Sequence, residues 1–213
     1  SLFKYTESCV YKKAWNKTNT RARGIVFNTK TGTVVARPFD KFFNVGERPN
    51  TNMKVLLHRL KKDKVVATAK LDGSMVSVFY YNGEWRTATP GSLESPQAQY
   101  AKRKLLPKYN FDILPKDLTY VCEMIAPWDR ECKVCQYGDT DELIVLTAFE
   151  NKWDLTEIPR GRVLNLAGQA GLPVVGEYPL DPENPWGTPI PEGEEGFVAR
   201  FDDGQRVLSL IHI

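Results

Sequence analysis

Residues 65–80 read VVATAKLDGSMVSVFY, a β-prone run that is interrupted once by a lysine and once by an Asp-Gly pair. Val, Thr, Phe and Tyr favour strands on both sides of that pair. Asp72-Gly73 itself is typical of two-residue hairpin turns. The run therefore predicts two strands joined by a hairpin, with Lys70 just before the turn.

Lys70 is either a solvated charge beside a turn or a functional group. Alternate side chains of a strand share one face, so Lys70 lies on the face of Val66 and Thr68. A cation there favours an anionic partner, and a ligand phosphate would satisfy it. Gly73 allows a ligand to approach the backbone, and Ser74 adds a hydroxyl. Both interpretations stay open on this stretch alone.

Composition and charge limit the kinds of protein that this chain could be. Its 213 residues are 42% hydrophobic, which suits one large domain. Residues 1–64 hold 15 Lys and Arg against 4 Asp and Glu, residues 65–139 hold 9 against 9, and residues 140–213 hold 5 against 13. A basic segment suits a polyanion such as nucleic acid and clustered carboxylates suit a metal ion, although a solvated surface would explain both.

Features of membrane and secreted proteins are missing from the sequence. No run of about 18 apolar residues is present, and the first residues lack the apolar core of a signal peptide. Four cysteines are too few to indicate a disulfide framework. We therefore expect no membrane span and a reducing, intracellular environment.

Short β-prone runs separated by turn residues predict an α+β fold rich in antiparallel sheet, because regular alternation of strands and helices is missing. The expected strands are 24–27, 33–36, 65–71, 75–81, 85–88, 119–125, 143–149 and 196–201. Asn82-Gly83 predicts a hairpin turn. The expected helices are 97–106, ended by Pro107, then 159–169, ended by Gly171, and 51–61, whereas 179–193 is predicted to be a surface loop.

Two further segments place a single carboxylate beside apolar strand residues. Glu123 lies in YVCEMIAP, residues 120–127, and Glu195 lies in EEGFVAR, residues 194–200. Beside a phosphate pocket, such a carboxylate would bind a ribose hydroxyl or a divalent cation. Each glutamate alone is more often a charge on an edge strand.

Lys70-Leu71-Asp72-Gly73-Ser74, Glu123 and Glu195-Gly196 follow one another in the order of nucleotidyltransferase motifs I, III and IV. DNA ligases, RNA ligases and mRNA capping enzymes share these motifs, and the chain resembles this superfamily. The flanking segments RGIVF, residues 23–27, and RPFDKFFN, residues 37–44, are similar to ATP-dependent RNA ligases of the T-even phage tRNA-repair type. The resemblance covers nearly the whole chain.

The resemblance implies an antiparallel-sheet nucleotidyltransferase domain with flanking helices and an ATP-dependent end-joining reaction in three steps. Lys70 would form lysyl-AMP, AMP would pass to the 5′-phosphate of an RNA, and a 3′-hydroxyl would displace it. ATP and Mg²⁺ (or Mn²⁺) would be the cofactors. The enzyme would act as a monomer, away from membranes, in the cytoplasm of a phage-infected bacterium.

The same likeness assigns roles to individual side chains. Arg23 and Lys41 would contact phosphate or nucleotide, and Phe43 would help to shape the site. The other expected cofactor-binding residues are Leu71, Asp72, Gly73, Glu123, which would bind ribose, and Glu195, which would also serve the metal.

Several positions depart from the family pattern. Cys122 stands where many relatives have an aromatic residue, and Pro90 stands where the phage enzyme has a basic one. Motif V should offer two lysines, but Leu208 and Leu210 occupy those places. The loss of both lysines should cripple lysine adenylylation.

The last six residues, LSLIHI, are also the translation of a transposase adapter used in sequencing libraries. We therefore expect residues 1–207 to be an adenylation domain that is incomplete at both ends, followed by a non-native tail over 208–213. The natural gene would then continue into a true motif V and a C-terminal domain.

Other interpretations stay open on the sequence. A DNA ligase or an mRNA capping nucleotidyltransferase uses the same motifs, and the missing motif V lysines favour a non-catalytic binder of nucleic acid or nucleotide. Cys132-x-x-Cys135 has the spacing of half a zinc site, but no second pair accompanies it. Trp15 and Tyr11 lie among lysines and are suited to stacking on bases.

Overall fold

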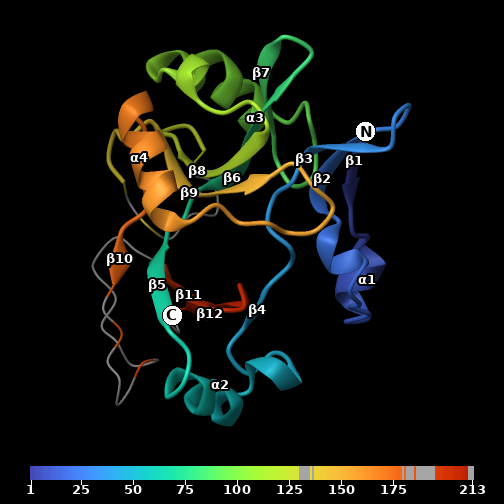
Figure 1. Ribbon diagram of the computed structural model, residues 1–213, viewed down its shortest axis with the longest axis vertical. Coiled ribbons are helices and arrows are strands. Elements are labelled where there is room, and N and C mark those ends of the chain that lie inside the picture. The colour runs from blue at the N-terminus through green and yellow to red at the C-terminus, as the bar shows by residue number, and fades with distance from the viewer. Residues whose placement is uncertain (130–134, 136, 179, 181–184, 186–194, 211–213) are drawn as a thin grey trace. The chain divides into compact units, whose positions relative to one another are not determined.

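The computed structural model divides the chain into two compact units, whose elements are labelled in Figure 1. The described residues are 1–129, 135, 137–178, 180, 185 and 195–210. The first unit comprises Ser1–Lys41, Gly73–Glu131 and Gly138–Val174, and the second comprises Phe42–Asp72, Cys132–Tyr137 and Val175–Ile213. The division falls between Asp72 and Gly73, so motif I contributes residues to both units.

Two antiparallel sheets form the first unit. The four-stranded sheet has the order β7-β6-β8-β9 and consists of β6 (Ser74–Tyr81), β7 (Glu84–Ala88), β8 (Leu118–Ile125) and β9 (Glu142–Glu150). The three-stranded sheet has the order β1-β2-β3 and consists of β1 (Leu2–Lys4), β2 (Arg23–Asn28) and β3 (Thr33–Ala36). Asn82 and Gly83, with φ angles of 53° and 84°, form the predicted turn between β6 and β7.

The helices of the first unit are α1 (Glu7–Tyr11), α3 (Pro96–Tyr100) and α4 (Arg160–Ala170). α4 contacts β9, beside which it is drawn in Figure 1, and it ends at Gly171 with a φ of 76°, as predicted. The prediction that one helix runs to Pro107 is wrong in its second half. After α3 the chain forms a π-helical turn, Ala101–Leu105, and Pro107 lies inside the tight turn that follows. Proline fits the first positions of such a turn because they need no amide donor.

A large apolar core lies between the four-stranded sheet and the helices of the first unit. Its fully buried members include Val76, Leu105, Met124, Val145 and Val163, from β6, the π-helical turn, β8, β9 and α4. A smaller cluster joins β2 and β3 to β6 and β7, and it consists of Val26, Val35, Ala36, Phe79 and Ala88. The first unit therefore has its own core and holds its two sheets together.

The second unit is built on a five-stranded sheet of order β10-β5-β11-β12-β4. Its strands are β4 (Phe43–Asn44), β5 (Val65–Lys70), β10 (Glu177–Tyr178), β11 (Gly196–Phe201) and β12 (Arg206–Leu210). Helix α2 (Met53–Leu60) begins at Asn52, whose side chain accepts a 3.0 Å hydrogen bond from the Lys54 amide. Leu56 of α2 packs with sheet residues such as Ala67 and Phe201, so α2 covers one face of the sheet.

The hairpin predicted at Asp72-Gly73 is wrong. β5 pairs with β10 and β11, whereas β6 pairs with β7 and β8, so the two strands belong to different sheets. Local propensity detects a turn but cannot identify the strand's partner, and here the partners come from distant segments. A Cβ atom on Gly73 would lie 2.4 Å from the carbonyl oxygen of Met124, so only glycine fits at this crossing.

The structure confirms an α+β fold rich in antiparallel sheet, with a strand at each predicted position. Only the pairing of β12 with β4 is parallel among the described strands of the sheets. Within the described residues, no helix has the length and apolar character needed to cross a membrane. Of the loop predicted over 179–193, only Leu180 and Pro185 belong to the described part of the chain.

Candidate active site

Lys70 is the last residue of β5, on the half-exposed face of the second unit's sheet. Ala67 and Ala69 point into the core, whereas Thr68 and Lys70 are only partly buried, as the predicted alternation requires. The Lys70 side chain retains 27% of its exposure. The lysine therefore stands at a strand end with a partly exposed side chain, on the face opposite α2.

Glu195 is the direct partner of Lys70. The Glu195 carboxylate forms an ion pair with the Lys70 ammonium, and its amide donates a 3.1 Å hydrogen bond to the Lys70 carbonyl. Glu195 comes just before β11 rather than inside it, and β11 is an inner strand between β5 and β12. The edge-strand interpretation is therefore wrong here, because strand pairing itself places this carboxylate beside the amine.

Asp72 forms hydrogen bonds with Tyr137 and Cys135. The sequence patterns did not single out Tyr137. The Asp72 amide donates a 2.9 Å hydrogen bond to the Tyr137 hydroxyl, and its carboxylate accepts a 3.0 Å hydrogen bond from the Cys135 amide. Burial raises the pKa of the Tyr137 phenol, which keeps it neutral. Because 63 to 65 residues separate these partners in sequence, no local pattern could have revealed the contact.

Cys135 thus has a structural role beside motif I. The other cysteine of the proposed zinc half-site, Cys132, lies outside the described residues. No group of three or more His, Cys, Asp or Glu side chains in the described part of the chain is arranged to hold a metal ion. A magnesium ion, however, commonly uses one or two carboxylates and takes its other ligands from water and substrate phosphates. Glu195 fits that mode of binding.

In the first unit, Glu123 lies beside Gly73. The Gly73 amide donates a 3.1 Å hydrogen bond to Glu123 Oε1, and a Cβ on Gly73 would lie 2.8 Å from Glu123 Cγ. β8, which carries Glu123, is an inner strand between β6 and β9, so the edge-strand interpretation is wrong for this residue too. Backbone contacts therefore fix the carboxylate expected to bind ribose.

Arg23 belongs to the same part of the first unit. It begins β2, and burial lowers the pKa of its guanidinium, while Tyr5 and Glu123 act in the opposite direction. Trp15 packs edge-to-face on Tyr5 at 4.9 Å between ring centroids, and Lys41 Nζ lies 5.9 Å from the Trp15 ring. Two of the expected phosphate-binding cations are thus linked through aromatic side chains.

Pro90, the departure at an expected basic position, has a packing role. Gly24 adopts a φ of 91°, and a Cβ atom there would lie 2.8 Å from the Pro90 Cα. The backbone at Pro90 thus lies close to Gly24 of β2, the residue that follows Arg23 in the sequence. Cys122, the other departure in this unit, is fully buried, and burial raises the pKa of its thiol.

Phe43 and the motif V positions lie in the second unit. The Phe43 ring is 5.2 Å from the Arg48 guanidinium, and Phe43 pairs with Val207 of β12. Leu208 stands opposite Val198, and Leu210 stands opposite Gly196, which in turn stands opposite Lys70. These register positions lie on the Lys70 face of the sheet, where lysines would face the same ligand as Lys70.

Asp129 is another residue that sequence analysis missed. Its carboxylate accepts a 2.5 Å hydrogen bond from the Ser74 hydroxyl and a 3.1 Å hydrogen bond from the Gln97 side chain. The Ser74 hydroxyl, which the sequence suggested for a ligand, thus has a protein partner. Leu71 is half-buried between Lys70 and Asp72. The second unit therefore groups Lys70, Asp72 and Glu195, while the first groups Gly73, Glu123 and Arg23.

Known proteins show similarities along most of this chain. A curated Thermovibrio ammonificans protein named an RNA ligase is 36% identical over 135 residues, which are 61% of this chain and 34% of that protein. The chain thus spans about a third of the length of that relative.

Two solved structures share the fold. An Aquifex aeolicus protein described as an ATP-dependent DNA ligase has a TM-score of 0.61 at 15% identity, covering 96% of this chain and 61% of that one. A Naegleria gruberi RNA ligase variant, solved with ATP and Mn, has a TM-score of 0.60 at 14% identity, covering 80% and 55%. The fold is therefore that of ligase nucleotidyltransferases. The RNA ligase family model matches residues 21–181, which is more than half of the sequence, and the chain belongs to this family.

Proposed function

We propose that this chain is the nucleotidyltransferase part of an ATP-dependent RNA ligase, with Lys70 as the nucleophile. The observation that carries the proposal is the placement of Lys70 at the end of β5, with its amine on an accessible sheet face and Glu195 against it. Family membership supports RNA as the substrate.

In the first step, the Lys70 ammonium releases a proton to water and its Nζ attacks the α-phosphorus of ATP. The Nζ–P bond forms as the P–O bond to pyrophosphate breaks, which leaves lysyl-AMP. The Glu195 ion pair holds the amine at the strand end before attack, and it must loosen as Nζ becomes neutral.

In the second step, a 5′-phosphate oxygen of RNA attacks the same phosphorus and the Lys70 amine leaves. In the third step, the RNA 3′-hydroxyl attacks that 5′-phosphate and loses its proton to water, AMP leaves, and a phosphodiester joins the ends. Both steps need oriented phosphates more than acid–base groups. Arg23 and Lys41 would supply positive charge for this orientation, and Glu123 would hold the ribose.

Glu195 would hold a divalent cation, Mg²⁺ or Mn²⁺, together with the phosphates of ATP, and that cation would neutralise phosphate charge. We further propose that the enzyme acts as a monomer on RNA with 5′-phosphate and 3′-hydroxyl ends, in the cytoplasm of a phage-infected bacterium.

A second candidate function is non-catalytic nucleotide or RNA binding. It is favoured by the register of β12, which puts Leu208 and Leu210 where lysines would face the nucleotide. Incubation with α-labelled ATP and a divalent cation, followed by denaturing electrophoresis, separates the two candidates. We expect weak labelling of the chain as it stands and stronger labelling of the double variant Leu208→Lys, Leu210→Lys.

In that double variant, Lys70→Ala should abolish the labelled band, whereas Lys64→Ala, at an exposed position just before β5, should leave it unchanged. Label that persists after Lys70→Ala would sink the proposed nucleophile. Labelling by GTP instead of ATP would favour a capping enzyme, and sealing of nicked DNA but not RNA would favour a DNA ligase.

A further inference from the structure

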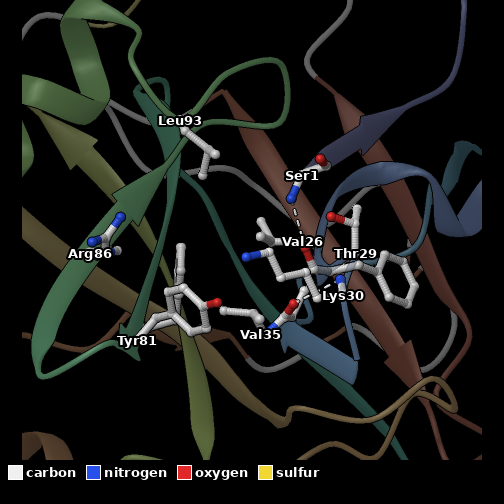
Figure 2. A pocket seen from close by; sticks show the side chains of 11 residues that line it. Ser1, Val26, Thr29, Lys30, Val35, Tyr81, Arg86 and Leu93 are labelled. Atoms are coloured by element: carbon white, nitrogen blue, oxygen red, sulfur yellow. Dashed lines mark hydrogen bonds between the residues drawn. The ribbon is translucent and has the colours of Figure 1, made fainter. Parts of the chain in front are cut away.

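A pocket of about 380 Å³ lies within the first unit, and Figure 2 shows the side chains that line it. Its walls come from β2, β3, β6 and β7 and from the turn after β2. Figure 2 shows Tyr81 and Arg86 on one side and Val26, Val35 and Lys30 on the other. None of the residues assigned to the nucleotidyl transfer lines this pocket.

Apolar side chains form the inner surface of the pocket. Val26, Val35 and Phe79 line it and are no more than 7% exposed, and they belong to the cluster that joins the two sheets. Tyr81 packs on this cluster while its ring borders the pocket. Because these residues lie on paired strands, the pocket has a fixed shape that suits a flat, partly apolar group.

The rim of the pocket is cationic. Lys30 is exposed in the turn between β2 and β3 and forms no ion pair with any described residue. Arg86 keeps 41% of its side-chain exposure, lies 5.7 Å from the Tyr81 ring, and pairs with Glu84 at 2.7 Å. Glu84 also pairs with Lys102 at 2.9 Å. Glu84 thus faces two cations, and Lys30 adds a separate positive charge at the rim, which leaves the rim with a net positive charge.

A pocket with apolar walls and a positive rim suits a ligand in which a flat apolar group is joined to a phosphate. Ligand pockets typically measure about 300–1,000 Å³, so this volume suits one nucleotide rather than several. We propose that the pocket binds one nucleotide of the RNA strand, with its base against Tyr81 and its phosphate at Lys30 and Arg86. The proposal rests on the proposed function only in taking RNA as the substrate.

The direct test is fluorescence anisotropy of a labelled, 5′-phosphorylated single-stranded RNA, titrated with the full chain at several salt concentrations. Tyr81→Leu should weaken binding by about 5-fold or more, because stacking on an aromatic ring is lost, while Tyr81→Phe should bind as the original chain does. Lys30→Gln and Arg86→Gln should each reduce the slope of log affinity against log salt by about 0.7.

Arg103→Gln is the matched control, because it removes the same charge at an exposed position of the first unit outside the pocket. Equal affinity and equal salt slope for Arg103→Gln and the pocket variants would overturn the proposal. Lys30→Gln keeps the test valid even where Tyr81→Leu unfolds, since Lys30 is exposed in a turn. A parallel titration with AMP tests whether the pocket binds a free nucleotide instead of RNA. Pocket variants that lose AMP binding but keep RNA binding would overturn the assignment to RNA.

Lysine adenylylation gives a separate readout. In the Leu208→Lys, Leu210→Lys background, the pocket variants should accept label from ATP as their parent does, because that step needs no RNA. Absence of labelling in every variant would count against the proposed ligase function and leave the RNA-binding comparison intact. Equal RNA binding with normal labelling would count against the pocket alone.

Discussion

Glu123 and Glu195 are both expected to serve the nucleotide, yet the two units hold them by different means. Glu123 lies inside an inner strand and accepts a hydrogen bond from the Gly73 amide, in a place too tight for a side chain at residue 73. Glu195 stands before its strand and is held by the ion pair with Lys70, with 25% of its side chain exposed. The first carboxylate is thus fixed by backbone and packing, and the second by an ion pair at a partly exposed position.

The largest effect should come from Gly73→Ala. The new Cβ would lie 2.4 Å from a backbone carbonyl oxygen, which cannot move without disturbing β8. We expect a loss of about 3 kcal/mol in the free energy of unfolding, measured by urea denaturation, together with loss of adenylylation. Gly91→Ala is the control, since its nearest neighbour atoms are 3.8 Å away on the flexible Lys4 side chain. Equal stability of the two variants would show that this segment is not packed as described.

Glu123→Ala should have the next largest effect. It removes the carboxylate that accepts the 3.1 Å hydrogen bond from the Gly73 amide, which should lower the free energy of unfolding by about 1–3 kcal/mol. Glu123→Gln keeps an oxygen in place and should recover most of this loss without restoring the charge near Arg23. Urea denaturation of the two variants measures the difference, and identical losses would contradict a hydrogen bond as the cause.

Glu195→Gln should have the smallest effect on stability and a large effect on chemistry. A partly exposed ion pair contributes no more than about 1 kcal/mol, so the urea midpoint should change little. In the Leu208→Lys, Leu210→Lys background, however, labelling by α-labelled ATP should fall steeply, because Glu195 is proposed to serve the divalent cation. Glu142→Gln, at an exposed position of β9, should leave both measurements unchanged. A large loss of stability with normal labelling would reverse the comparison between the two glutamates.

The sequence was sufficient for elements whose determinants are local. Strand positions followed from β-prone runs, and the turn at Asn82-Gly83 and the end of α4 at Gly171 followed from residues that tolerate positive φ. The prediction of a hairpin at Asp72-Gly73 was wrong because an Asp-Gly pair also suits a connection between strands of two different sheets. The predicted end of the helix was wrong because the π-helical turn that follows α3 depends on the packing of residues such as Leu105.

The candidate site divides in the same way. The motif spacing identified Lys70, Glu123 and Glu195. In the structure, Lys70 pairs with Glu195, and Glu123 accepts a hydrogen bond from Gly73 of motif I. Tyr137 and Asp129 escaped notice because their contacts with the motif I segment join residues more than 50 positions apart. A tyrosine or aspartate in a loop carries no signal for such a contact, and only the folded chain provides it.

The turn between β11 and β12 has a consequence for how this chain can change. Phe201 and Gln205 close it through a 2.9 Å hydrogen bond, and Gly204 adopts a φ of 81°. Because side chains alternate along a strand, deletion of one codon here would move every β12 residue to the opposite face. Ser209 would then take the place of Leu208 on the Lys70 side. The length of this turn therefore decides which residues of β12 share a sheet face with Lys70. Lysines at positions 208 and 210 would face the nucleotide only while the turn keeps its present length.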